Sequence, residues 1–153
     1  MKKIILSAMF LFGAGFAQAG SSSIDLTGDY EQVFATPSGN ILCGGGSLKK
    51  ADTTLYQNDL YCFVYRNKNT PKRCLKQGVG LDFTLNAAGG AKQHCAGFEF
   101  PPENEGREKT RILQYGETVA GKGWSCTGET VGLTCRNAGG HGFTLNSSRY
   151  RLF

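Results

Sequence analysis

The chain has 153 residues, with 17 lysines and arginines against 12 aspartates and glutamates, 22 glycines and six cysteines. This length fits one domain and is too short for two. The hydrophobic fraction of 40 % and the aromatic fraction of 11 % exclude a mostly disordered chain, and the glycines show no collagen period. Because no catalytic or cofactor motif stands out, the sequence defines compartment and fold more sharply than activity.

Residues 1–19 have the features of a cleaved signal peptide. Lysines at positions 2 and 3 precede an apolar stretch over 4–16, and residues 17–19 (Ala-Gln-Ala) form a small-x-small cleavage signal. The apolar stretch is shorter than the ~20 residues of a membrane span. We therefore predict export to the periplasm or the extracellular space, with no membrane span in the mature chain. The alternative is an uncleaved N-terminal anchor.

After a small, polar lead-in over residues 20–30, which we expect to be flexible, residues 31–153 have the pattern of a single β domain. Short alternating apolar segments are separated by Gly, Asn, Pro and Thr, as is typical of strands and turns, and no long window has helical spacing. The predicted strands cover residues 31–36, 40–44, 59–65, 80–86, 92–97, 111–115, 122–127, 130–136, 141–146 and 149–153. Segments 66–73 and 101–109 are predicted loops, the first of them basic.

All six cysteines follow the predicted cleavage site. An even number of cysteines in an exported chain predicts disulfides rather than free thiols. A zinc site is the alternative, but structural zinc sites use close C-x2-4-C pairs, and the tightest spacing here is Cys126 to Cys135. We therefore expect three disulfides and no metal.

The sequence contains an internal repeat. Four cysteines each follow an apolar residue by two positions, which places both on one face of a strand. These pairs are Ile41/Cys43, Leu60/Cys62, Trp124/Cys126 and Leu133/Cys135. Further along each half, GLDFTLN (80–86) is matched by GHGFTLN (140–146). The repeat predicts a duplicated β unit, and hence an all-β fold: a small, disulfide-stabilised antiparallel β-sandwich or barrel of two related halves.

The repeat also favours one of the fifteen pairings that six cysteines allow. Cys126 and Cys135 flank a short Gly-containing connection that a β-hairpin would close, so we expect them to pair. By analogy Cys43 pairs with Cys62 in the first half. Cys74 and Cys95, which have no counterparts, then pair with each other.

Several segments resemble a family of uncharacterised bacterial secreted domains. They are TPSGNILC (36–43), LQYGETV (113–119) and GLTCRNAGGHGF (132–143), with RYRLF at the end. They are similar to that family's PSGNI-x-C start, YG step and G-x-TC-x-N…GHGF…Y finish, and the resemblance covers residues 33–153. It implies a small exported disulfide-bonded domain, and it supplies no catalytic residue. The segment 99–110 is longer than the family spacing, so a partner contact there would be particular to this chain.

Two turns and a basic loop are the candidate contact surface. Residues 36–40 and 139–142 have the chemistry of tight turns, and we expect both to lie on one rim of the domain. The alternative is that both are plain turns. The candidate contact residues are Ser38, Asn40, Arg66, Lys72, Arg73, Asn137, His141 and Arg149.

Positive charge gathers in two segments without acids. One holds Arg66, Lys68, Lys72, Arg73 and Lys76, and the other holds Arg136, Arg149 and Arg151. If they adjoin, they form a basic face suited to phosphates, an acidic glycan or an acidic protein; the alternative is a solvated surface. Acids gather instead in segment 99–108. Without the two lysines of the signal peptide the net charge is only +3, which argues against a nucleic-acid module.

We therefore predict an exported, non-enzymatic binding or inhibitory module, a monomer without a cofactor, whose partner is a protein or an anionic ligand of the envelope or of a glycan. One alternative is a small secreted hydrolase in which His141 acts with an acidic partner; another is a structural envelope component. Paired cysteines leave no thiol for a nucleophile beside His94, and no serine lies in a G-x-S-x-G context.

Overall fold

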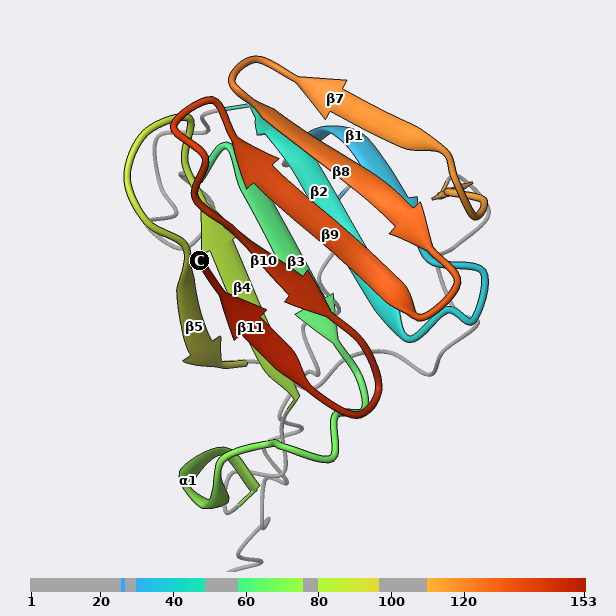
Figure 1. Cartoon of the computed structure of the whole chain (residues 1–153), viewed down its shortest axis with the longest axis vertical. Helices are drawn as coiled ribbons and strands as arrows, with labels where there is room; N and C mark the ends of the chain where they lie inside the picture. Colours follow the sequence, from blue (N-terminus) through green and yellow to red (C-terminus); the bar gives the residue numbers. More distant parts are fainter. Residues whose placement is uncertain (1–25, 27–29, 49–57, 76–79, 97–109) are drawn as a thin grey trace, which may run out of the picture.

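The computed structural model describes residue 26 and residues 30–48, 58–75, 80–96 and 110–153. In this part of the chain, short strands form two sheets (Figure 1). The elements are β1 (Tyr30–Ala35), β2 (Ile41–Ser47), β3 (Leu60–Val64), α1 (Lys72–Leu75), β4 (Leu81–Leu85), β5 (Lys92–Cys95), β6 (Arg111–Ile112), β7 (Thr118–Gly121), β8 (Trp124–Glu129), β9 (Gly132–Asn137), β10 (Gly142–Leu145) and β11 (Tyr150–Leu152).

Each sheet is built from consecutive strands of one half of the chain. The first sheet has the order β5-β4-β3-β2-β1-β6, in which β6 pairs parallel to β1, and the second has the order β11-β10-β9-β8-β7. All other neighbours are antiparallel. Figure 1 shows strands β7–β11 of the second sheet, orange to red, lying over strands β1–β5 of the first, blue to olive. The predicted all-β fold is confirmed, and of the two expected architectures it is the sandwich.

The core lies between the two sheets. Alternation along the strands turns one set of side chains inward, and this set is almost completely buried. The first sheet contributes Phe34, Leu60, Phe83 and Leu85, and the second contributes Trp124, Leu133, Phe143 and Leu145. A smaller apolar cluster covers the other side of the first sheet; it includes Leu26, Tyr30, Leu42, Tyr61 and Phe63.

The strand registers show that the sequence repeat is a structural repeat. In the first sheet Cys43 lies opposite Cys62, which lies opposite Phe83. In the second sheet Cys126 lies opposite Cys135, which lies opposite Phe143. The two halves therefore place the same residue types at the same positions of two similar sheets.

The disulfides are Cys43–Cys62, Cys74–Cys95 and Cys126–Cys135, the three pairings that the repeat predicts. The first and third each join directly opposite residues of adjacent strands, with Cα atoms 4.1 Å apart. The second ties α1 to β5. Bridges that close loops of this size each stabilise a domain by about 3 kcal/mol.

Two elements differ from the prediction. β7 (Thr118–Gly121) lies outside the predicted strands, because a four-residue edge strand contributes only Val119 to the core and gives little alternation. The basic loop 66–73 leads into the short helix α1, where the amides of Cys74 and Leu75 donate to the carbonyl of Pro71. The sequence pattern does not indicate so short a turn of helix.

The predicted signal peptide, the predicted loop 101–109, the acids of segment 99–108 and Lys76 lie outside the described residues. Of the lead-in 20–30, the structure describes Leu26 and Tyr30. Both are buried, and Tyr30 begins β1. Within the described part of the chain, no helix has the length and apolar character needed to cross a membrane.

Candidate ligand-binding face

The two turns expected on one rim lie at opposite ends of the sandwich. The side chain of Asn40 bonds the backbone of Arg66 beyond the end of β3: Nδ2 donates to the carbonyl at 3.0 Å, and Oδ1 accepts from the amide at 2.9 Å. Asn137 instead bonds the turn that follows β4, because its Nδ2 donates to the carbonyls of Asn86 and Gly89. Since β3 and β4 are antiparallel neighbours, the end of each lies at an opposite edge of the sheet. The predicted single rim is therefore replaced by two separate ends.

At the first end, Ser38 and Asn40 build the turn. The Oγ of Ser38 accepts from the amide of Asn40 at 3.3 Å and lies 3.3 Å from the hydroxyl of Thr36. Their polar atoms serve local structure, as the plain-turn alternative states.

The basic loop meets the turn that carries Arg149 at this same end. The Nδ2 of Asn67 donates to the carbonyl of Asn146 at 2.7 Å, and the amide of Lys68 donates to the carbonyl of Ser147 at 3.0 Å. Part of the expected junction between the two basic segments is thus present. Lys72 and Arg73 lie elsewhere, on α1 at the β5 edge, where Arg73 donates to Gln93 at 3.3 Å.

At the second end, Asn137 is an interior residue with 5 % of its surface exposed. Both of its side-chain donors reach the first sheet, and its Oδ1 accepts from the amide of His141 at 3.0 Å. It therefore joins the two sheets, and its predicted contact role stays a prediction.

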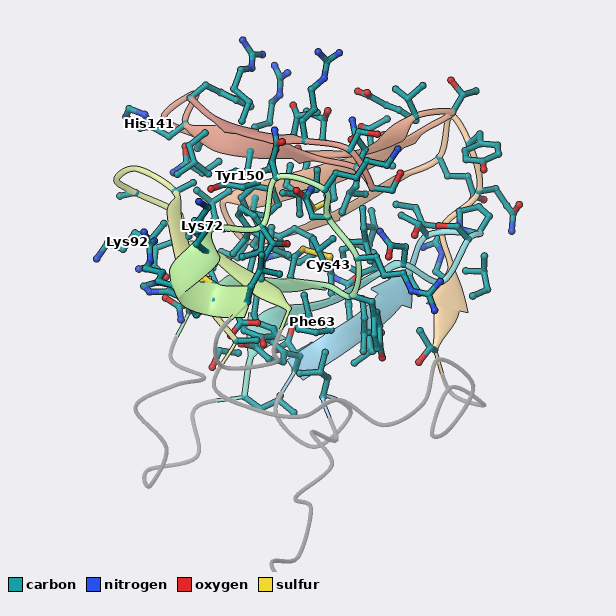
Figure 2. All side chains as sticks on the ribbon, turned by 90° about the horizontal axis from the view of Figure 1, so that it is seen from below. Cys43, Phe63, Lys72, Lys92, His141 and Tyr150 are labelled. Atoms are coloured by element: carbon teal, nitrogen blue, oxygen red, sulfur yellow. A yellow bond between two sulfur atoms is a disulfide. The ribbon has the colours of Figure 1, made fainter. Side chains whose placement is uncertain are left out.

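The His141 side chain is exposed at the same end (Figure 2). Among the described residues no carboxylate forms an ion pair with it, and no cluster of His, Cys, Asp or Glu has the arrangement of a metal site.

The outer face of the second sheet carries a row of threonines. In register across four adjacent strands lie Thr118, Thr127, Thr134 and Thr144. The hydroxyls of Thr118 and Thr127 are 2.9 Å apart, and those of Thr134 and Thr144 are 3.3 Å apart. Threonine suits this position because its branched side chain favours strands while its hydroxyl faces water.

Three exposed arginines lie beside this row. Arg151 of β11 is directly opposite Thr144, and Arg136 of β9 is directly opposite Gly142. Arg149 lies directly before β11, two residues from Arg151, and its carbonyl accepts from the amide of Asn146 at 3.1 Å, next to the Leu145–Tyr150 pair of β10 and β11. Nitrogen-tipped side chains stand out from this face in Figure 2. We call the surface formed by these three arginines, the four threonines and Phe153 the arginine–threonine face.

Positive charge dominates this face. None of the three arginines forms an ion pair with a carboxylate of the described residues; the ion pair seen in that part of the chain joins Arg111 to Glu117. Glu129 points the same way as Thr127, but it lies on β8, three strands away from the Arg149 end of β11.

Matching positions of the repeat carry different residue types on the outer faces of the two sheets. Arg136 and Thr134 are adjacent to Cys135 just as Phe63 and Tyr61 are adjacent to Cys62. In the first sheet these positions are apolar or aromatic and buried in the second cluster. In the second sheet they are cationic or hydroxylated and reach solvent. The arginine–threonine face is therefore the outer surface that the sandwich presents.

A second unusual group is Asp82 on the covered side of the first sheet. It is 8 % exposed and lies opposite Phe63 on one strand and His94 on the other. Burial raises the pKa of Asp82 to about 6, while the hydrogen bond from the Tyr61 hydroxyl, at 2.7 Å, acts to lower it. No sequence signal marks the Tyr61–Asp82 pair.

The arginines of the face were visible in the sequence as an acid-free basic segment, although Arg136 and Arg151 were not among the candidate contacts. The threonines were not singled out, since their alignment depends on the registers of four strands.

One family model matches the chain over residues 17–153; it is described as a family of unknown function (DUF6636). No curated protein and no solved structure matches.

Proposed function

Since the chain belongs to DUF6636, a family of unknown function, we propose its role from geometry: it is a binding module that recognises an anionic ligand through the arginine–threonine face. The observation that carries this proposal is the set of three exposed arginines, Arg136, Arg149 and Arg151, on an open face where no described carboxylate pairs with them. Unpaired guanidinium groups bind carboxylates and phosphates through charge-assisted hydrogen bonds.

The ligand class follows from the rest of the face. Threonine hydroxyls both donate and accept, so they match ligands rich in hydroxyl groups. A surface that combines a hydroxyl row with cations suits an acidic glycan, and the flat outer side of a sheet suits an extended polymer. The three disulfides are typical of a protein of an oxidising compartment, where such glycans occur. We therefore propose that the protein is exported, as residues 1–19 predict, and acts without catalysis.

The test compares binding of the purified, oxidised protein to two anionic polymers, polygalacturonate and dextran sulfate, and to neutral dextran. We expect binding to at least one of the anionic polymers and none to dextran, and we expect this binding to weaken as salt is added, because screening reduces contacts between exposed charges. A triple variant with Arg136→Ala, Arg149→Ala and Arg151→Ala should lose at least ten-fold in affinity.

A matched control removes the same number of positive charges elsewhere, through Lys72→Ala, Arg73→Ala and Lys92→Ala at the α1 and β5 edge. This variant should lose less than two-fold. Equal losses in the two variants would show that binding depends on net charge rather than on this face. Absence of binding to polygalacturonate and to dextran sulfate alike would refute the proposal.

A further inference from the structure

Two of the arginines on the arginine–threonine face share one aromatic ring. The guanidinium carbon of Arg136 lies 5.8 Å from the centroid of the Phe153 ring, and that of Arg151 lies 5.4 Å from it. Both distances are within the range of cation–π attraction. The two charged groups are thus no more than about 11 Å apart, the sum of these two distances.

The position of the ring is fixed by the backbone beneath it. The amide of Phe153 donates to the carbonyl of Gly142 at 3.0 Å, and the amide of Gly142 donates to the carbonyl of Phe153 at 2.8 Å. A Cβ atom on Gly142 would lie 2.9 Å from the Cζ atom of Phe153, closer than real contacts allow. The ring therefore lies over a position where the second sheet has no side chain, between the strands that carry the two arginines.

Stacking on a ring prepares an arginine for binding in a way that a free arginine lacks. An exposed arginine loses rotamer entropy when it is fixed by a ligand. A guanidinium already held against a ring has lost part of this entropy, and a ring contact through its flat face leaves the in-plane N–H groups able to bond two oxygens of one oxyanion. Among the described arginines, Arg136 and Arg151 lie over the Phe153 ring and Arg149 does not, so Arg149 offers charge without this support.

Resting on the proposed function, we infer that Arg136, Phe153 and Arg151 form an oxyanion clamp, in which each of the two arginines binds one oxyanion group. This clamp sets the specificity of the face for a glycan with two oxyanion groups about 11 Å apart or less. Carboxylate and sulfate both accept the bidentate fork, and the test below separates them.

The test replaces each arginine by lysine, which keeps the charge but loses the planar fork. With polygalacturonate or dextran sulfate as probe, Arg136→Lys and Arg151→Lys should each weaken binding about five- to ten-fold. Arg149→Lys is the matched control and should weaken it less than two-fold. The polymer that shows the larger loss identifies the preferred oxyanion.

A second pair of variants tests the ring. Phe153→Leu removes the ring while leaving all three arginines, and it should weaken binding several-fold; Phe153→Tyr keeps the ring and should bind like the parent protein. If the parent binds and all of these variants bind equally well, the clamp is wrong and the face binds through charge alone, which leaves the proposed function intact. If the parent binds neither polymer, the proposed function fails together with the clamp.

Discussion

Phe83 and Phe143 meet in the middle of the sandwich with their ring centroids 5.6 Å apart, one from each sheet. Each lies opposite a disulfide cysteine in its own sheet, Cys62 or Cys135. The two copies of the repeat thus contribute the same side chain to the centre of the core.

The first prediction concerns this pair. Phe83→Leu and Phe143→Leu each keep an apolar side chain of similar size, so each should lower the free energy of unfolding by about 1–2 kcal/mol. Because the rings touch, the double variant should lose about 1 kcal/mol less than the sum of the single variants. Urea unfolding of all four proteins measures this coupling, and strict additivity would contradict it.

The second prediction concerns the glycines around Trp124. Cβ atoms on Gly45 and Gly121 would lie 2.1 Å and 2.5 Å from atoms of the indole ring, which is buried and stacked on Phe34. Gly45→Ala and Gly121→Ala should therefore each destabilise the fold by about 1–3 kcal/mol through overpacking.

Gly90→Ala is the matched control for these two variants, because a Cβ atom there has no neighbour within 4 Å. It should change stability by less than about 0.5 kcal/mol. Trp124 is the single tryptophan of the chain, so its fluorescence reports unfolding in all three variants. A cost for Gly90→Ala as large as that for Gly45→Ala would contradict the steric argument.

The third prediction concerns pH. In the folded state the pKa of Asp82 is raised from 3.8 to about 6, so between these values the folded protein binds more protons than the unfolded chain. Stability contributed by this group is therefore greatest below about pH 4 and falls as the pH rises to about 6, by about 3 kcal/mol at most.

Asp82→Asn removes this titration, so it should flatten the decline and make the protein more stable than the parent at pH 8. Tyr61→Phe removes the hydrogen bond that lowers the pKa, so it should move the decline to higher pH. Thermal unfolding from pH 4 to pH 8 distinguishes these outcomes. If Asp82→Asn loses as much stability between pH 4 and pH 6 as the parent protein does, another group causes the loss.

The fourth prediction concerns the order in which the disulfides are reduced. Cys43, Cys62, Cys126 and Cys135 are fully buried, whereas Cys95 is partly exposed on β5. Since thiol–disulfide exchange needs access to a sulfur atom, mild reduction without denaturant should open Cys74–Cys95 and leave the other two intact. Alkylation followed by peptide mass spectrometry should find label on two cysteines, and on all six after urea is added. Early label on Cys43 would contradict this order.

The sequence predicted the strands and the cysteine pairing because both depend on local alternation. Cys126 and Cys135 lie opposite each other only when the intervening residues close a hairpin, and the repeat extends that reasoning to Cys43 and Cys62. β7 was not predicted, because Val119 is the one residue of this strand that packs in the core.

The placement of the two turns at opposite ends of the sandwich could not be predicted, because it depends on how one sheet lies on the other. The turns at 36–40 and 139–142 belong to different sheets, and local pattern carries no information on their mutual direction. Asn137 shows the same limit. Its place in the sequence corresponds to Val64, a core residue, yet it is polar because it bonds the turn of the opposite sheet.

All six cysteines pair within their own half of the chain, so no covalent bond joins one sheet to the other except the main chain that leads from β6 to β7. Contacts such as those of Asn137 and the Phe83–Phe143 pair hold the layers together without any cross-link between them. Two copies of the molecule can therefore exchange halves, each keeping its bridges oxidised throughout, and form a domain-swapped dimer without any thiol chemistry.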